Sequence, residues 1–339
     1  MKLLDYDIKD DSFYLFTCAQ LKAKEAEFID KSKIERLLGA SGLDEFIRVL
    51  RDTVYSDYAG EVENSASFES VILGEYKNIA DFLDRRLKHN HRPSGELLFF
   101  EENLHNIKTV IKSIIMDVNL EELYIPVYYS YGELRDATVS GDYREISSPV
   151  SNTLRFAGGE IDRQENRRIL EFEIEKFYLQ ELFNSIKKIQ SRLIMDYLRH
   201  VVDILNIKNI YRNKYLDEDL APALFLHNNG FVPVELIMKF RSEQTADLFF
   251  KKIKQSDYAD IVAKGADVLN SQNSFVSFDK EEVLFYIELF EPLKYTVSNV
   301  EKVFQFFLRK KIELKKLNII FEGVLYGISA EKIKDRVLV

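Results

Sequence analysis

Few side chains in this sequence have the types and spacing that catalysis or metal binding requires. His89 and His91 form a His-x-His pair just before Pro93, and such a pair could supply two ligands to a zinc ion. A tetrahedral site needs further His, Cys or carboxylate ligands at suitable spacing, and none is evident, so an exposed loop pair is favoured. The other histidines stand singly and are interpreted as hydrogen-bonded helix or loop residues: His105, His200 and His227.

Cys18 is the one cysteine, so no disulfide can form within the chain. A nucleophilic cysteine needs a neighbouring base and an electropositive pocket, and the sequence identifies neither. A small, buried, apolar side chain in a reducing compartment is the favoured interpretation of Cys18.

The usual motifs of nucleotide chemistry are absent. The sequence has no G-x-x-x-x-G-K-[ST] run and no G-x-G-x-x-G run, so neither familiar phosphate-binding loop is present. No set of acid, base, nucleophile and metal ligands converges either. We therefore predict that the protein is not an enzyme and uses no cofactor and no metal.

The most informative polar residues belong to an internal repeat. Asn106-Ile107-Lys108 and Asn206-Ile207-Lys208 each lie within a predicted amphipathic helix, and Arg212 follows the second copy. A weaker copy, Gln20-Leu21-Lys22, keeps the order of amide, apolar residue and lysine. In the favoured, structural interpretation each amide caps or bridges helices, because buried polar groups need partners, and the cations face solvent. In the alternative interpretation these polar groups line a cavity and contact a partner.

A tyrosine follows each copy of this motif. Ser56-Asp57-Tyr58-Ala59 and Ser256-Asp257-Tyr258-Ala259 are identical, and Gly141-Asp142-Tyr143 lies between them. Two markers in the same order, three times, indicate three helical units of about 100 residues each. We place these units at residues 1–95, 96–200 and 201–339, with closing carboxy-terminal helices in the third.

Helical periodicity dominates the elements that carry these residues. Apolar residues recur every three or four positions near 14–29, 66–88, 98–117, 203–215 and 300–322. The longest stripe predicts one helix over 160–201, about 40 residues and roughly 60 Å long. Breaks are predicted at 39–42, 91–95, 147–149, 157–159 and 227–230. Gly and Pro are scarce, 13 and 6 in 339 residues, which favours long helices and an all-α fold.

Composition excludes several classes of function. Net charge is −9, with 47 basic and 56 acidic residues, the opposite balance to that of most proteins that bind nucleic acid. The first residues, Met-Lys-Leu-Leu-Asp, become acidic too early for a secretory signal. No run of about 18 apolar residues occurs, so no span of a bilayer is predicted. Any work at a membrane must therefore use a partner that is embedded there.

Four segments together resemble one known family. They are the opening helix at 13–22 with Leu37-Leu38 and the Thr53-Val54-Tyr55 end of the first repeat, the segment at 173–178, the run at 202–212, and the end at 323–336. In this order and spacing the chain resembles the C subunit of bacterial and archaeal V/A-type ATPases, which is the equivalent of the d subunit of the eukaryotic V-type enzyme. One departure is the opening helix, which has Lys22 and Lys24 where the family usually has an Arg-rich helix.

The resemblance implies three similar helical domains around a pseudo-threefold axis, forming a funnel with a central cavity. It implies a non-catalytic subunit of the central stalk, with shaft subunits D and F on one end and the membrane proteolipid ring on the other. Such a socket transmits torque for ion transport and is cytoplasmic, peripheral on the membrane through its complex. Proton and sodium coupling, and pumping and ATP synthesis, fit the sequence equally. The alternative function is a cytosolic helical-repeat adaptor for an unrelated protein complex.

Overall fold

Every secondary-structure element in the described part of the chain is a helix. The computed structural model describes residues 6–161, 163–164, 166–215, 221–235, 237, 258–272 and 274–337. No strand occurs among them, which confirms the all-α prediction. The division into similar domains at 1–95, 96–200 and 201–339, and their arrangement as a funnel, stay predictions.

Contacts between residues divide the chain into two units, each made from two stretches of sequence. The first unit contains Met1–Tyr6 and Ala80–Val262, and the second contains Asp7–Ile79 and Ala263–Val339. The two main boundaries fall inside helices α4 (Ser65–Arg86) and α14 (Ala259–Gln272). Each unit is described below by itself.

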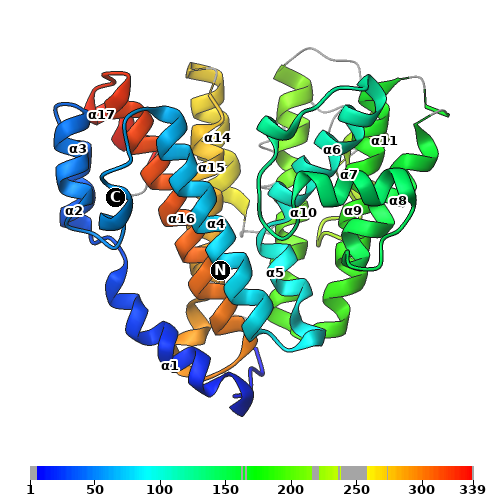
Figure 1. Cartoon of the computed structure of the whole chain (residues 1–339), viewed down its shortest axis with the longest axis horizontal. Helices are drawn as coiled ribbons and strands as arrows, with labels where there is room; N and C mark the ends of the chain where they lie inside the picture. The colour runs from blue at the N-terminus through cyan, green and yellow to red at the C-terminus, as the bar shows by residue number, and fades with distance from the viewer. Residues whose placement is uncertain are drawn as a thin grey trace. The chain divides into compact units, whose positions relative to one another are not determined.

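The first unit is a bundle around α9. Its helices are α5 (Pro93–Leu98), α6 (Phe100–Met116), α7 (Tyr131–Ser140), α8 (Ser148–Glu160), α9 (Arg167–Ile186), α10 (Arg192–Tyr215) and α11 (Pro222–Phe225). Helix α8 packs along α9, and α6 contacts α7, α8 and α9 (Figure 1). The apolar stripe of α9, from Leu170 through Ile174 and Tyr178 to Leu182, is buried as its spacing predicts. Helix α9 is therefore the core element of this unit.

The prediction of one helix over residues 160–201 is wrong. Helix α9 ends at Ile186, a short 3-10 turn η6 (Lys187–Ile189) follows, and α10 begins at Arg192. Gln190 has a left-handed backbone, φ 60° and ψ 22°. A residue in this conformation ends a helix because the chain leaves the path on which the backbone hydrogen bonds of the helix form. Ser191 Oγ accepts a hydrogen bond from Ile194 N at 3.2 Å and so caps the start of α10. The predicted break at 157–159 is also wrong, because α8 continues through Glu160.

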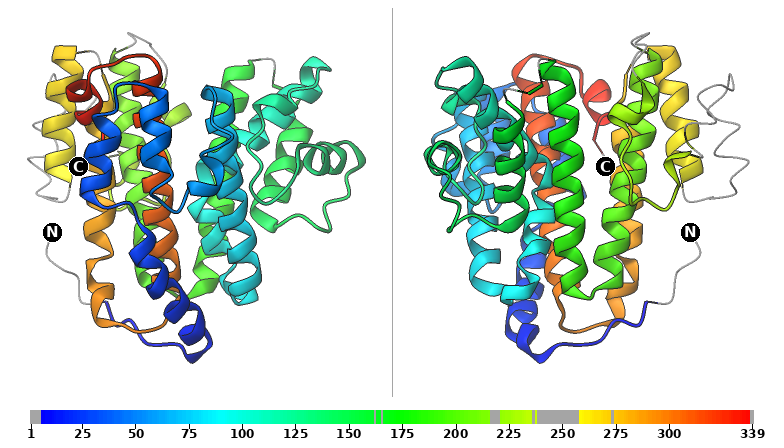
Figure 2. Two further views of the ribbon diagram at one scale, coloured as in Figure 1. Left: turned by 60° about the vertical axis from the view of Figure 1, so that its left-hand side comes forward. Right: turned by 90° about the vertical axis from the view of Figure 1, so that its right-hand side faces the viewer.

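The second unit is organised along α16 (Val300–Leu325). In the described part of the chain this unit also contains most of α4 and of α14, and the following whole helices: α1 (Leu15–Lys24), α2 (Lys31–Leu38), α3 (Leu43–Leu50), α15 (Val276–Leu289) and α17 (Ala330–Lys334). Helices α1, α2, α3 and α17 all contact α16, and Figure 2 shows α1 beside one end of it. Phe46, Phe68 and Phe321 form its aromatic core, with ring centroids 4.1–5.7 Å apart and each side chain almost fully buried. Helices α4, α6 and α16 confirm the helices predicted near 66–88, 98–117 and 300–322.

Candidate functional site

Asn106 on α6 holds the backbone of one residue in the loop that follows. Its Nδ2 donates to the carbonyl oxygen of Ile125 at 2.7 Å, and its Oδ1 accepts from the amide of Ile125 at 2.9 Å. One amide side chain thus satisfies both backbone polar groups of Ile125. Asn106 is itself buried. It therefore fixes the path of the chain after α6.

Asn206 on α10 makes the same pair of contacts. Its Nδ2 donates to the carbonyl oxygen of His227 at 2.8 Å, and its Oδ1 accepts from the amide of His227 at 2.7 Å. Asn206 is fully buried. The sequence repeat is thus also a repeat of contacts, in which an asparagine on a helix holds a later loop residue through two backbone hydrogen bonds.

The cations of the two motifs have different surroundings. Lys108 Nζ lies 2.8 Å from Glu175 Oε2 on α9, and only a fifth of its side chain is exposed. Lys208 is buried, whereas Arg212 is exposed. The structural interpretation expects all three cations to face solvent. Lys108 and Lys208 are largely buried instead.

Glu175 joins the two motifs within the first unit. Its Oε2 pairs with Lys108, and its Oε1 accepts from His227 Nε2 at 3.0 Å. Lys108 belongs to the first motif, and His227 is the residue that Asn206 of the second motif holds. Burial alone would raise the pKa of Glu175, but the His227 hydrogen bond and the Lys108 charge lower it to about 2. Glu175 therefore carries a negative charge throughout the physiological pH range.

A pocket of about 470 Å³ opens beside this ion pair. Helices α6, α9, α10 and α11 form its walls, so all of it lies in the first unit. Residues from these four helices line it: Phe100, Glu101, Leu104, His105, Lys108, Arg168, Phe172, Glu175, Leu179, Leu205, Asn209, Arg212, Asn213 and Phe225. The sequence repeat thus contributes Lys108 and Arg212 to one pocket of the first unit. Whether the repeated polar groups line a cavity that contacts a partner stays a prediction.

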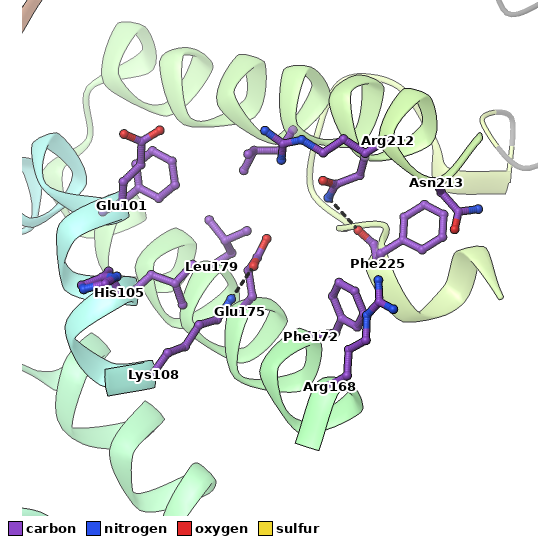
Figure 3. Close-up of a pocket in the computed structure, with 14 residues that line it drawn as sticks. Glu101, His105, Lys108, Arg168, Phe172, Glu175, Leu179, Arg212, Asn213 and Phe225 are labelled. Atoms are coloured by element: carbon purple, nitrogen blue, oxygen red, sulfur yellow. Dashed lines mark hydrogen bonds and ion pairs between the residues drawn. The ribbon is translucent and has the colours of Figure 1, made fainter. Parts of the chain in front are cut away.

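The charged side chains reach this pocket from different walls (Figure 3). Lys108 and Glu175 meet on the side of α6 and α9, while Arg168 and Arg212 extend from α9 and α10. Glu101 lies on α6. Asn209 Nδ2 donates to the carbonyl oxygen of Phe225 at 3.1 Å and ties α11 to α10. Cationic side chains outnumber acidic ones in the lining, and the remaining walls are mostly aromatic or aliphatic.

The weak first copy of the motif lacks this arrangement. Gln20 Oε1 on α1 is buried and has no hydrogen-bond partner among the residues that the structure describes. Lys22 forms an exposed ion pair with Glu25 in the same helix. Gln20 and Lys22 belong to the second unit, whereas Glu175 and its partners belong to the first.

The three tyrosine markers make three different contacts. Tyr58 donates to Glu75 Oε1 at 3.0 Å, and Tyr143 lies under the guanidinium of Arg155, 4.9 Å from it. Tyr258 is buried and donates to Asp203 Oδ2 at 2.8 Å. Ser256 and Asp257 of the third marker lie outside the described residues. The tyrosines therefore do not form one common site.

Tyr258 belongs to a buried polar cluster on α10. His200 Nδ1 lies 2.6 Å from the Tyr258 hydroxyl oxygen. Asp203 also accepts hydrogen bonds from the backbone amides of Phe231 and Val232. Burial raises the pKa of Asp203 to about 6, although its hydrogen bonds oppose this, and burial lowers the pKa of His200 to about 4. These bonds fix the loop after His227 against α10.

Cys18, His89 and His91, which the sequence analysis considered for catalysis or metal binding, do not line this pocket. Cys18 is buried, with Sγ 3.7 Å from the carbonyl oxygen of Asn299, and burial raises the pKa of its thiol. His89 and His91 lie in a short 3-10 turn, η4 (His89–His91). Among the residues that the structure describes, no group of three or more His, Cys, Asp or Glu side chains could hold a metal ion. A buried thiol with a raised pKa is a poor nucleophile.

Sequence reasoning missed Glu175, and it interpreted His227 as a hydrogen-bonded helix or loop residue without identifying its partner. Glu175 directly follows the buried Ile174 on α9, so a charged side chain at the margin of an apolar stripe was the available signal. His227 lies in a predicted break, where a single histidine carries no information about its partner. Only the fold brings it to Glu175.

Within the described parts of the chain, no helix is both long enough and apolar enough to cross a bilayer.

Comparison with known proteins gives consistent matches over nearly the whole chain. A model of the family described as ATP synthase (C/AC39) subunit matches residues 17–336. The A-type ATP synthase C subunit of Methanosarcina mazei is 23% identical, and the alignment covers 98% of this chain and 94% of that protein. The protein of the same name from Methanocaldococcus jannaschii is 21% identical, and the alignment covers 95% of this chain and 85% of that protein. The one from Haloferax volcanii is 22% identical, and the alignment covers 96% of this chain and 97% of that protein.

Proposed function

Because this chain belongs to the ATP synthase (C/AC39) subunit family, we propose that it is a non-catalytic central-stalk subunit of a rotary V/A-type ATPase. In this role it is the socket between the shaft, made of subunits D and F, and the proteolipid ring in the membrane. It transmits torque between nucleotide chemistry elsewhere in the complex and ion transport through the ring. The match of the family over residues 17–336 carries this proposal, supported by relatives named as C subunits of A-type ATP synthases that align over nearly their whole length.

The residues described above fit a structural rather than a catalytic role. The polar groups of the two clear motifs hold loop backbones and form an ion pair, contacts that stiffen a helical body. The chain also lacks the phosphate-binding loops that nucleotide hydrolysis uses. We therefore propose that ATP is bound and hydrolysed or made by other subunits.

Its place on the cytoplasmic side of the membrane follows from the proposed partners. The protein is held there through the ring and not through lipid, because binding to anionic lipid normally uses clustered Lys and Arg, and this chain has a net charge of −9.

Affinity purification from native membranes tests the proposal. The tagged chain should recover shaft subunits D and F together with the proteolipid of the ring. A second purification, after detergent extraction that separates the ring, should retain the shaft subunits. Recovery of an unrelated set of proteins, with no ATPase subunit among them, would reject the socket and favour the cytosolic adaptor.

A further inference from the structure

A second pocket lies wholly within the second unit, between the start of α2, the end of α15 and one face of α16. Its volume of about 420 Å³ falls within the range of about 300–1,000 Å³ that ligand pockets occupy. Most of its lining is apolar, with Phe28 and Ile34 from the first stretch of the unit, Ile287 from α15, and Leu308 and Ile312 from α16. Walls of this kind favour a compact apolar body.

Two of the four charged residues in this lining have partners near the surface. Glu291 pairs with Lys294 in the same short turn, at 3.6 Å. Arg309 on α16 pairs with Glu25 at 3.9 Å. These two pairs therefore leave no net charge in the pocket.

The third charged residue, Glu313 on α16, is buried and has partners at both of its oxygens. Its Oε1 accepts from the Tyr55 hydroxyl at 2.8 Å and pairs with Lys310 Nζ at 3.1 Å. Its Oε2 accepts from the amide of Ile29 at 2.6 Å. The charge of this carboxylate is thus already balanced by Lys310, and its oxygens hold the chain that leads into α2.

The fourth charged residue, Lys316, is a half-buried cation one turn further along α16. In the described part of the chain its ammonium group interacts electrostatically with Glu313 but forms no ion pair or hydrogen bond. Two ammonium groups, those of Lys310 and Lys316, thus share one carboxylate. Burial lowers the pKa of Lys316, although the charge of Glu313 opposes this. Removing an ammonium group from water without a full partner costs free energy, which a second carboxylate at this position would offset.

We propose that this pocket binds a small monocarboxylate with a compact apolar body. The carboxylate pairs with Lys316, and the apolar body lies against Phe28, Ile287 and Ile312. A second negative charge on the ligand is disfavoured, because Glu291 and Glu313 belong to the same lining. All of the lining comes from one unit, so binding needs neither the shaft nor the ring and is independent of the proposed socket role.

Isothermal titration of the purified chain with hydrocinnamate tests the proposal, with the neutral hydrocinnamamide as a second probe of nearly the same shape. Hydrocinnamate should bind at one site, and at least about tenfold more tightly than the amide, because its carboxylate gains a charge-assisted contact. Lys316→Gln should weaken hydrocinnamate by at least about tenfold and leave the amide unchanged. Lys315→Gln is the matched control, since it removes the same charge from the exposed neighbouring position on α16 and should leave both probes unchanged.

A third variant locates the bound ligand. Ile287 lines the pocket but is 37% exposed, so a larger side chain there can fill the pocket without disturbing the core. Ile287→Trp should weaken both probes by at least about tenfold, and thermal unfolding shows whether each variant folds.

Four results would each overturn the proposal. They are absence of hydrocinnamate binding to the wild type, equal binding of the two probes, equal weakening by Lys316→Gln and Lys315→Gln, and unchanged binding to a folded Ile287→Trp variant. None of these outcomes affects the socket role, which purification of the complex tests separately.

Discussion

At the scale of single residues, the two buried asparagines of the repeated motif make contacts whose contribution to stability can be measured. Asn106 and Asn206 each pair with both backbone groups of a loop residue, Ile125 and His227. A backbone N–H and C=O that lose their partner in the interior cost about 1–3 kcal/mol each. A stability measurement can therefore separate this contact from ordinary helix packing.

Asn206→Ala should lower the free energy of unfolding by about 2–4 kcal/mol, because both backbone groups of His227 lose their partner. Asn209→Ala on the same helix is the control, since it removes a single hydrogen bond to Phe225 and should cost about 1 kcal/mol. Urea unfolding followed by circular dichroism measures both. Equal losses for the two variants would contradict the double contact.

A second residue-scale prediction concerns Glu96 on α5, whose side chain is buried. Burial raises its pKa from 4.5 to about 7, and the neighbouring Ser147 offsets only part of this rise. The folded state therefore holds a proton that the unfolded state releases above pH 4.5, so stability falls as pH rises through about 7. One pKa unit corresponds to about 1.4 kcal/mol, so the loss should reach about 3 kcal/mol.

Glu96→Gln keeps the neutral form at every pH and removes this loss. The variant should resemble the wild type near pH 4.5 and be more stable by about 3 kcal/mol above pH 7. Urea unfolding at pH 5 and at pH 8 measures the difference. A gap between variant and wild type that stays the same at both pH values would rule out titration of Glu96.

At the scale of elements, the turn between α9 and α10 decides the topology of the first unit. Gln190 has φ 60°, a left-handed conformation that costs a non-glycine residue about 1 kcal/mol or more. Gln190→Gly should therefore raise the free energy of unfolding by about 0.5–1 kcal/mol. Within a continuous helix the same substitution would instead lower stability by about 1 kcal/mol. Urea unfolding distinguishes the two, and a loss of stability would contradict the turn.

The same turn shows where sequence reasoning succeeded and where it failed. Helix type and the inward face of α9 followed from the spacing of Leu170, Ile174 and Tyr178, because periodicity reports which side of a helix is buried. The stripe continues in phase through Ile186, Ile189 and Leu193, so periodicity could not reveal the reversal between them. Ser191, the cap of α10, was the local signal, but serine occurs at many other positions as well.

The sequence identified some of the residues that line the pocket between α6, α9, α10 and α11, but not the partners that they contact. The repeat identified Asn106, Lys108, Asn206 and Arg212 as a related set, and the structure places Lys108 and Arg212 in one cavity. It could not identify Glu175 as the partner of Lys108, because that contact depends on how α6 packs against α9. The spacing of residues along one helix carries no information about which distant helix it contacts.

At the scale of the whole molecule, the proposed division of labour predicts no nucleotide chemistry in this chain. Calorimetric titration of the purified protein with ATP and magnesium should give no stoichiometric binding, since neither familiar phosphate-binding motif occurs in the sequence. An assay of phosphate release by the chain alone should give no activity above that of buffer. A stoichiometric site for ATP would contradict the assignment of catalysis to other subunits.

The last prediction concerns docking to the membrane. A joint that bears torque must resist twisting, and many distributed polar contacts serve this better than one apolar anchor. The net charge of −9 opposes adsorption to anionic lipid, so the protein should float with vesicles that contain the proteolipid ring and not with bare anionic vesicles. Raising the salt concentration should release it from ring vesicles, because exposed charge pairs are screened beyond about 8–10 Å at physiological ionic strength. Vesicle flotation with and without reconstituted ring, at low and high salt, measures both effects. Equal binding to the two kinds of vesicle would place the contact on lipid and remove the ring from the proposed function.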